Sequence, residues 1–442
     1  MNTNVVLKFN TGESKGETIT FSNHETVTVG RDEQSCKLII PESYKTVSRN
    51  HCSLTIDAPF VIVSDLNSKN GTWINEHKIG EAAIDFAKTE DIKNVIKSTN
   101  DFLLKPGDKL ILGGEKNKNG KVEIEGCELE LEYVNLNDYF ETVKDCIDEG
   151  RMGVVKLVKD KDVETKSLMA VKVLKNKIKG VSEDNMIRIK DWFVREFYNG
   201  RQLSDHDNVV NYYHLGSYNA RPAIVMEYCP GGSLEKLFFN RIDDNIEYMK
   251  SIGKKIDLAT KIIFQVFDAL DYMHNKAEAK VALADNRIYI TTGMVHRDIR
   301  PDNILLMDDS LENPVVKIVD LGFTKTFWAA GKSNNTYPDE ACGDWSYVPK
   351  QQAQNYLYSQ PKVDVWATFA SCYRMLVGVP PKGFIPENGR QQVIKKRAVD
   401  IRVYNPDIPK KLAEVINNAL IDDPDIIVEK ASKAKVQIMN AL

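Results

Sequence analysis

The segment VHRDIRPDNILL, residues 295–306, places an acid, Asp298, and an amide, Asn303, in one short polar stretch. A second acid, Asp320, follows the apolar run VVKIV, and Lys172 lies inside the apolar pattern MAVKVL. A buried lysine needs a charged partner, for which Glu196 in WFVREFYNG is the candidate. Phosphoryl transfer needs a positioner for the attacking hydroxyl, carboxylate and amide oxygens for magnesium, and cations on the nucleotide phosphates. Asp298, Asn303 with Asp320, and Lys172 would supply these three requirements in turn.

Two further signals are weak when taken alone. The stretch EGRMGVVKLV puts Gly150 and Gly153 between apolar residues that alternate as in strands. Such a loop lets backbone amides approach phosphates closely, but a plain hairpin turn explains it equally well. For Glu196 by itself, a solvated helix face is the simpler interpretation. The order of all the pieces along the chain favours the catalytic interpretation.

A different polar set lies near the amino terminus. VTVGRD places Arg31 just after a strand, TVSRNHCSLTI adds Ser48 and His51, and DLNSKNGTWIN supplies Asn70 and Gly71. Arg31 alone fits a solvated loop charge, and KNG suits a hairpin turn in any β protein. Together, the G-R, S-x-x-H and N-G-T motifs all lie in loops between expected strands.

The bulk composition is ordinary for a globular protein. The chain has 442 residues, a formal net charge of -4 and seven cysteines. This length allows two or three domains, and the near-neutral balance gives no basic surface for nucleic acid. Scattered cysteines without a C-x-x-C pair favour a reducing intracellular compartment, cytoplasmic or nuclear. There is no signal-peptide pattern, and the most apolar stretch contains Asp364 and Arg374, so no membrane partner is expected.

The patterning changes along the chain. Residues 1 to about 135 read as short strands separated by turns, with CELELEYV, 127–134, as the closing strand. Within this part, AAIDFAKTEDIKNVIKS, 82–98, has helical spacing and is expected to be an inserted helix. Residues 140–230 hold strand candidates around one helical segment, and the chain beyond 233 is mainly helical, including LATKIIFQVFDALDYMH.

From about residue 140 to 440 the chain resembles the protein kinase family, whose signature motifs occur here in the same order. The resemblance implies a catalytic set of Asp298, Lys172, Glu196, Arg300, Asn303 and Asp320. Asn303 and Asp320 would bind Mg²⁺, Lys172 and Glu196 would form an ion pair, and Asp364 would brace the catalytic loop. The implied ATP site comprises Gly150, Gly153, Ala170, Lys172, Glu227, Cys229, Ser233 and Leu305, with Met226 as gatekeeper.

The sequence departs from the family pattern at four places. Asp148 replaces the first glycine of the glycine-rich loop, and AEAKVALADNRIYITT, 277–292, is an insertion expected to form a surface hairpin. GDWSYVPKQ carries Asp344 and Gln351 where kinases have Thr and Glu. The usual arginine partner of that glutamate is replaced by Ile427, so both partners of a buried ion pair are absent together. Losing both is nearly neutral, which indicates a replaced brace; similarly, Asp344 could pair with Arg300.

Residues 5–135 resemble the forkhead-associated (FHA) domain, whose G-R, S-x-x-H and N-G-T motifs all occur here. The resemblance implies that this part binds phosphothreonine-containing proteins. The implied binding residues are Arg31, Ser48, Arg49, Lys69 and Asn70. His51, Gly30 and Gly71 would be structural.

The expected fold is multidomain: an all-β FHA sandwich over 1–135, followed by an α+β bilobal protein kinase fold over 140–442. The kinase lobes are predicted as 140–228 and 229–442. The expected function is an ATP- and magnesium-dependent serine/threonine protein kinase, in a domain order that resembles checkpoint-type kinases. A scaffold that binds phosphopeptides and nucleotide without transfer is the alternative. A transferase for a non-protein hydroxyl is a third.

Autophosphorylation between transiently associated chains is also expected. The candidate phosphosites are Thr336 and Ser333, in a polar stretch after Asp320. The resemblance to kinases that carry an arginine at Arg297 implies that a loop phosphate there would pair with it and order the segment.

Overall fold

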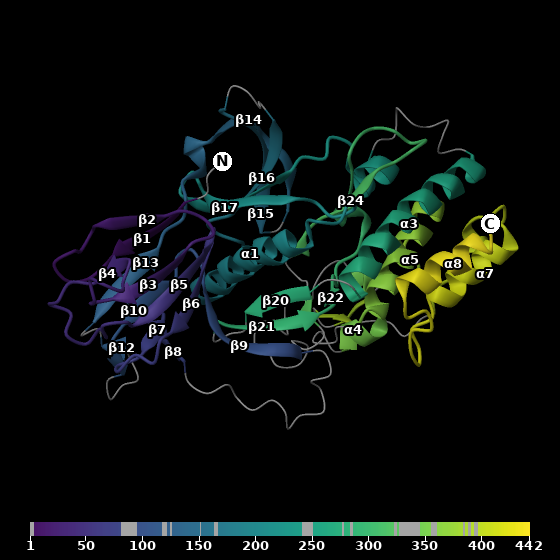
Figure 1. Ribbon diagram of the computed structural model, residues 1–442. Helices are drawn as coiled ribbons and strands as arrows, with labels where there is room; N and C mark the ends of the chain where they lie inside the picture. Colours follow the sequence, from purple (N-terminus) through teal and green to yellow (C-terminus); the bar gives the residue numbers. More distant parts are fainter. Residues whose placement is uncertain are drawn as a thin grey trace. The chain divides into compact units, whose positions relative to one another are not determined.

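The computed structural model describes most of the chain (Figure 1). The described residues are 4–80, 95–116, 122–123, 126–150, 152–162, 167–240, 251–275, 278–282, 286–321, 325–326, 345–354, 360–382, 385–387, 390–392 and 397–442. The chain divides into two compact units. The first comprises Met1–Val194, Tyr213–Met226 and Lys280–Thr291, and the second comprises Arg195–Tyr212, Glu227–Ala279 and Thr292–Leu442.

The amino-terminal module contains two main sheets. The first has six strands in the order β2-β1-β13-β10-β7-β8. Its strands are β1 (Val5–Phe9), β2 (Thr18–Phe21), β7 (Thr72–Ile74), β8 (His77–Ile79), β10 (Lys109–Leu112) and β13 (Cys127–Leu131). The predicted strand near 127–134 is present as β13, which pairs antiparallel with both β1 and β10.

The second sheet has seven strands in the order β20-β21-β9-β6-β5-β3-β4. Its strands are β3 (Thr26–Gly30), β4 (Leu38–Ile39), β5 (Cys52–Asp57), β6 (Phe60–Asp65), β9 (Val95–Leu104), β20 (Glu278–Ala282) and β21 (Arg287–Thr292). β11 (Glu115–Lys116) and β12 (Val122–Glu123) form a separate pair.

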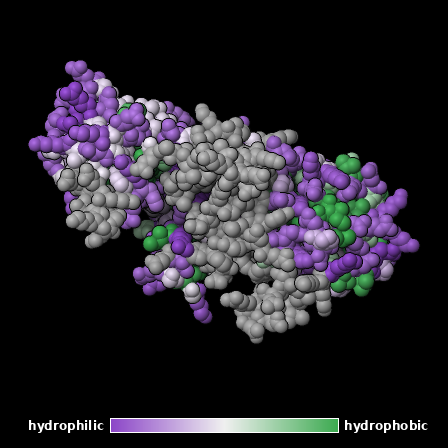
Figure 2. Space-filling view, turned by 90° about the horizontal axis from the view of Figure 1, so that it is seen from below, coloured by the Kyte–Doolittle hydropathy of each residue, from purple (hydrophilic) through white to green (hydrophobic). Residues whose placement is uncertain are grey.

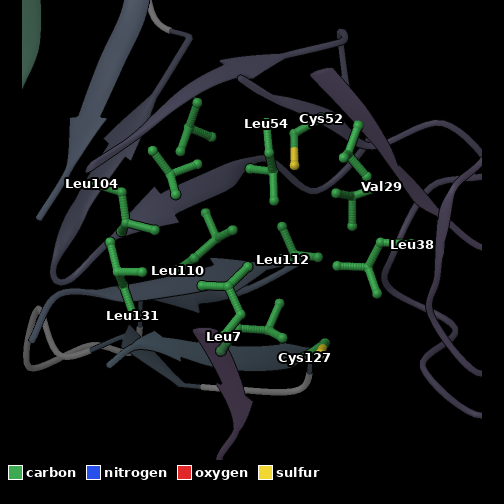
Figure 3. Close-up of a cluster of buried hydrophobic side chains, with 14 of the residues drawn as sticks. Leu7, Val29, Leu38, Cys52, Leu54, Leu104, Leu110, Leu112, Cys127 and Leu131 are labelled. Carbon is green, nitrogen blue, oxygen red and sulfur yellow. The ribbon is translucent and has the colours of Figure 1, made fainter. Parts of the chain in front are cut away.

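Apolar side chains from the two sheets form one core. Leu54, Val29 and Leu104 come from the second sheet, and Leu7 and Leu110 come from the first (Figure 3). All are fully buried or nearly so. The alternating burial of β1 and β5 shows that one side of each strand faces this core, which is the sandwich arrangement that the sequence predicted.

Two predicted insertions differ from expectation. The helix predicted over 82–98 is wrong at Val95–Ser98, which belong to β9; residues 81–94 lie outside the described residues. This end of β9 pairs with β21, with Val95 opposite Thr291 and Ser98 opposite Tyr289, and this pairing decides the structure over the local helical spacing. The predicted hairpin over 277–292 forms β20 and β21, but it is not a surface feature. Ile288 and Tyr289 are 2% and 1% exposed, because β21 pairs with β9.

The amino-terminal kinase lobe contains a five-stranded sheet and one long helix. The strands are β14 (Phe140–Glu149), β15 (Gly153–Asp160), β16 (Leu168–Leu174), β17 (Tyr212–Tyr218) and β18 (Arg221–Glu227), in the order β14-β15-β16-β18-β17. The helix α1 (Glu183–Leu203) confirms the predicted helical segment. A small core forms under the sheet around Phe140, Val171 and Val225.

The carboxy-terminal unit is mainly helical, as predicted. Its helices are α3 (Ile252–Asn275), α4 (Lys350–Gln354), α5 (Lys362–Val377), α6 (Ile401–Tyr404), α7 (Lys410–Ala419) and α8 (Ala431–Met439). α5 is the central helix: Trp366 and Tyr373 are fully buried, and Phe369 packs on Phe267 of α3 with ring centroids 5.5 Å apart. This rigid centre supports the polar loop that follows α3.

Short strands complete the second unit. β19 (Gly232–Ser233), β23 (Ile304–Leu306) and β24 (Val316–Ile318) form one sheet. β22 (Met294–Val295) pairs with β25 (Lys325–Thr326), and β26 (Ile385–Glu387) pairs with β27 (Arg390–Gln392).

The described surface is largely hydrophilic on the face shown in Figure 2, with smaller hydrophobic patches between the polar side chains. The exposed hydrophobic residues include Val403 and Tyr404 of α6, at 71% and 50% exposure. In the described part of the chain, each helix is too short or too polar to cross a membrane.

Candidate active site and phosphate-binding loops

The loop between β22 and β23 holds the predicted catalytic acid. Asn303 donates two hydrogen bonds from Nδ2 to Asp298, one to the Oδ2 atom and one to the backbone oxygen, both 2.8 Å long. Arg300 lies on the other side, with Nε 3.6 Å from Asp298 Oδ1 and Nη1 2.8 Å from Asp302. The predicted acid and amide therefore lie in direct contact, and a cation neighbours the acid.

The Asp298 carboxyl is 6% exposed. Burial raises its pKa to about 7; Arg300 opposes this rise, and Asp320 adds to it through like-charge repulsion. Asp320 therefore lies close enough to Asp298 for their charges to interact. Two neighbouring acids, one of them buried, are an arrangement that a divalent cation would stabilise.

Asp364 of α5 fixes the backbone of the same loop. Its carboxylate accepts hydrogen bonds from the backbone amides of His296, at 2.8 Å, and Arg297, at 2.7 Å. His274 at the end of α3 contacts the same carboxylate through Nε2 at 2.8 Å. Arg297 has a positive φ of 72°, which such bonds hold in place. Asp364 therefore braces the loop as predicted.

Glu196 of α1 is 1% exposed. Burial, followed by the charges of Glu196 and Asp320, raises the pKa of Tyr212 well above its usual range. Both acids are therefore close to one buried phenol. Lys172 lies on β16 opposite Val155, half-buried as an apolar strand pattern predicts. The solvated-face explanation of Glu196 is excluded by its burial.

The glycine-rich loop closes as a tight hairpin. The amide of Gly150 donates to the oxygen of Gly153 at 3.0 Å, and Lys175 Nζ donates to the Gly150 oxygen at 2.9 Å. A Cβ on Gly153 would lie 3.0 Å from the Val173 oxygen, so glycine permits close strand packing there. Asp148 sits in β14 opposite Val155 and is exposed.

The side chain of Glu227, the last residue of β18, is held by neighbouring polar groups. Glu227 accepts hydrogen bonds from the side chain and backbone amide of Asn211, both at 3.1 Å, and its Oε2 lies 3.1 Å from Lys317 Nζ. Burial raises the pKa of the Cys229 thiol to about 12, so the thiol stays neutral. The Glu227 amide also donates to the Asn211 oxygen at 2.9 Å, and the Cys229 oxygen accepts from the Gly232 amide at 3.2 Å, so side chains and backbone together fix this segment.

Two of the predicted nucleotide residues are strand neighbours. Ser233 on β19 pairs with Leu305 on β23. Ser233 is 8% exposed, and its hydroxyl accepts a hydrogen bond from the Lys236 amide at 3.3 Å. In the other unit, Ala170 and Met226 are each 5% exposed.

A polar cluster joins α4 to the segment around Asp422. Gln351 Nε2 donates a hydrogen bond to the backbone oxygen of Asp422 at 2.8 Å. Ile427, in contrast, is 57% exposed, so it is not buried in this cluster. The Asp422 carboxylate accepts a hydrogen bond from the Lys350 amide at 2.8 Å and forms a buried ion pair with Lys382. These contacts join α4 to the segment around Asp422, and whether they take over the role of the family's ion pair stays a prediction.

Arg31, the predicted phosphate-binding arginine, is fixed by a backbone oxygen and forms an ion pair with a carboxylate. Arg31 Nε donates to the Val47 oxygen at 2.6 Å, which fixes the guanidinium plane. Its Nη1 lies 2.6 Å from Oε2 of Glu42. The Glu42 side chain is 78% exposed and that of Arg31 is 22% exposed, so this carboxylate reaches the guanidinium from the solvent side.

The neighbouring loops bring the other predicted residues together. The Lys69 amide donates to the Ser48 hydroxyl oxygen at 2.9 Å, which leaves the Ser48 hydrogen for another acceptor. Asn70 Nδ2 donates to the Thr46 oxygen at 2.7 Å. Arg49 and Lys69 are exposed. Because Arg31 also bonds the Ser48 oxygen through its own backbone amide, these loops form one cluster.

His51 is structural, as predicted. It is fully buried, its Nδ1 accepts from the Ser48 amide at 2.9 Å, and its Nε2 donates to the Gly71 oxygen at 3.1 Å. Burial lowers its pKa, in keeping with a neutral ring. Gly71 has a φ of 83°, and a Cβ on Gly30 would lie 1.9 Å from the Arg49 oxygen. Both glycines are therefore required by local geometry.

Some predictions fall outside the described residues. They concern the phosphosites Thr336 and Ser333, and the possible pairing of Arg300 with Asp344. Sequence reasoning also missed contacts that the structure shows, namely Glu42 on Arg31 and Lys382 on Asp422. Neither pair has a motif, since its members come from loops with no fixed spacing.

Two known family models match this chain, one in each part. The protein kinase domain model matches residues 142–426, and the FHA domain model matches residues 27–90. The first match alone spans more than half of the sequence. The chain belongs to the protein kinase family. An FHA domain precedes its kinase domain, so the expected family, fold class and domain order are confirmed.

Curated relatives indicate the serine/threonine class. The ovarian-specific serine/threonine-protein kinase Lok of Drosophila melanogaster is 26% identical over 426 residues, covering 91% of this chain and 76% of Lok. A probable serine/threonine-protein kinase of Clostridium acetobutylicum is 29% identical over 273 residues, covering 62% of this chain but only 36% of the relative. The crystal structure of Rad53 1-466 in complex with AMP-PNP covers 98% of this chain at 19% identity, with a TM-score of 0.46.

Proposed function

We propose that this chain transfers the γ-phosphoryl group of ATP to serine or threonine hydroxyls of proteins, and that its FHA domain recruits phosphothreonine-containing partners. The observation that carries the catalytic part is the buried Asp298 carboxylate, held by Asn303 in a loop that Asp364 fixes. A group that positions the attacking hydroxyl must itself be rigidly held, and this acid is held from two sides.

The residues present fit a nucleotide with magnesium. Asn303 uses its Nδ2 group for Asp298, so its Oδ1 atom remains as an oxygen ligand. Asp320 would supply a second oxygen ligand, and bound Mg²⁺ would neutralise charge on the transferring phosphate. Lys172 would hold the phosphates. The backbone of Glu227 and Cys229 would bind adenine.

Magnesium removal gives the direct test of transfer. The purified full chain with labelled ATP and Mg²⁺ should label serine or threonine in itself or in a protein substrate. Excess chelator should abolish the label, and added Mg²⁺ should restore it. Mapping the labelled residues tests whether Thr336 and Ser333 are among them. Retained nucleotide binding without any transfer would support the scaffold instead, which Asp148 beside the glycine hairpin favours.

The FHA loops fit a phosphate dianion. Arg31 offers a guanidinium held by Val47, and Ser48 has a hydroxyl hydrogen to donate. Asn70, Arg49 and Lys69 would extend the contact to the peptide. The phosphate would displace Glu42 from Arg31; because the Glu42 side chain is 78% exposed and returns to water, losing this pair costs about 0–1 kcal/mol. Docking of one chain's FHA domain on Thr336 of another belongs to the same proposal.

Arg31→Ala should weaken phosphothreonine peptide binding by about 2–4 kcal/mol, roughly 30- to 1000-fold in Kd, since a charge-assisted contact is lost. Fluorescence anisotropy with a phosphorylated peptide and its unphosphorylated form measures this. Lys37→Ala is the matched control, because Lys37 is an exposed cation of the same domain that pairs with Glu25. Equal binding of both peptide forms by the wild type would contradict the proposed recognition.

A further inference from the structure

The FHA domain holds the helix that carries Glu196. Lys105, in the turn after β9, places its Nζ 2.7 Å from Oδ1 of Asp191, which lies on α1. The two side chains are 13% and 28% exposed, so water screens this pair less than a surface pair. Glu196 follows on the same helix, a little more than one turn after Asp191. The FHA domain therefore contacts α1 just before Glu196, the acid that the proposed chemistry uses.

The inserted segment meets the same lysine. Lys105 Nζ also donates to Oδ1 of Asn286 at 3.1 Å, and the Leu103 amide donates to the Asn286 backbone oxygen at 2.7 Å. Asn286 is 4% exposed and has a φ of 62°. A residue held in this uncommon conformation by two contacts is positioned by its surroundings. Lys105 thus joins three segments that are distant in sequence.

Strand pairing makes this junction firm. β21 continues the FHA sheet beyond β9, and the two strands lie side by side in Figure 1. Thr99 Oγ1 donates to the Ile288 oxygen at 2.7 Å. The Arg287 guanidinium lies 4.8 Å from the ring centre of Phe102. An edge strand with unpaired backbone groups accepts such an added strand readily. The insertion into the kinase sequence therefore serves as an additional strand of the FHA domain.

A further observation places Asp191 against the FHA domain. Burial raises the pKa of Tyr133, and the negative charges of Asp108 and Asp191 raise it further. The linking chain is also tied to the kinase lobe, since the Ser217 amide donates to the Val134 oxygen at 2.8 Å. The domain is consequently attached through its linker, its edge strand and Lys105.

We propose that Lys105 and Asp191 are positioning residues, through which the FHA domain fixes α1 and thereby the orientation of Glu196. The proposal rests on the proposed kinase activity for its catalytic consequence, but the fixing of α1 can be measured without it. The partner surface is this chain's own FHA domain, and the contact needs no other molecule.

The strand order keeps the phosphate-binding loops away from this contact. β3, β5, β6 and β9 are neighbours, and each adjacent pair is antiparallel. The carboxyl ends of β3 and β9 therefore lie at opposite ends of the sheet. Arg31 follows β3 and Lys105 follows β9, so phosphopeptide binding and the hold on α1 use different ends of one sheet.

The test is a charge reversal in the full chain. Lys105→Glu and Asp191→Lys should each lower kcat by about 2- to 30-fold, with a smaller change in KM for ATP, because Glu196 acts in the transition state. The double variant should regain most of kcat, since the reversed pair attracts and the Asn286 amide can turn its NH₂ group toward Glu. Lys8→Glu, at an exposed pair with Glu132, is the matched control.

Hydrogen exchange separates this inference from the proposed function. Amides of α1 around Glu196 should exchange faster in each single variant and recover in the double variant, whether or not the chain transfers phosphate. Phosphothreonine peptide affinity should stay unchanged in all of them. Unchanged α1 exchange, or kcat losses that the double variant does not repair, would overturn the positioning role. A wild type without transfer but with the exchange pattern would refute only the proposed function.

Discussion

Asp298→Asn is expected to reduce phosphoryl transfer by about 10²- to 10⁴-fold, because an amide cannot accept the proton of the attacking hydroxyl. The substitution preserves shape. The Oδ1 atom of asparagine can still accept the bond that Asn303 donates, so the loop should keep its conformation. Nucleotide affinity should change little, since Glu227 and Cys229 belong to another segment. Initial rates with labelled ATP, together with a nucleotide Kd, measure both quantities.

The matched control for this variant is Asp407→Asn, at an exposed acid of the same unit. It should transfer phosphate at the wild-type rate, which excludes a general effect of lost negative charge. If wild type and Asp298→Asn were equally slow while both bound nucleotide, the scaffold explanation would replace the kinase. If both were equally fast, Asp298 would have no role in proton transfer.

The catalytic loop could be predicted from the sequence because its chemistry is local. Asp298 and Asn303 lie close in the chain, and the turn between them brings the amide onto the acid. The geometry of the phosphate-binding loops is also local. Because Ser48 and His51 are only three residues apart, the histidine ring can accept a hydrogen bond from the Ser48 backbone amide. In both places a few adjacent residues determine the geometry, so a motif is sufficient to find them.

The junction around Lys105 could not be predicted in this way. Asp191 and Asn286 lie 86 and 181 residues from it in sequence. The run RIYITT has the β-branched composition of a strand, but nothing in it specifies β9 as the partner. The helix expected at Val95–Ser98 was wrong for the same reason, because pairing with distant strands overrode a locally helical spacing.

The second large effect is expected on stability, at the ion pair of Lys382 and Asp422. Both side chains are 5% exposed, and Lys382 Nζ also lies 5.2 Å from the ring centre of Trp366. Removing one member leaves the other charge buried without its partner. Lys382→Met or Asp422→Asn should therefore each lower the free energy of unfolding by about 3–5 kcal/mol. Urea denaturation followed by tryptophan fluorescence, in a variant whose other four tryptophans are replaced by phenylalanine so that Trp366 gives the signal, measures the loss.

The double variant distinguishes a brace from an essential charge. In Lys382→Met, the new side chain keeps apolar contact with Trp366. In Asp422→Asn, the amide oxygen can still accept the hydrogen bond that the Lys350 backbone amide now donates to Asp422. The double variant should thus lose far less than the sum of the single variants. Lys435→Met, at the exposed pair with Asp268, is the matched control and should cost only about 0–1 kcal/mol. Additive losses would show that the two residues act independently. Strong coupling would mean that this pair, and not Gln351 or Ile427, stabilises the segment where the family usually places its arginine and glutamate.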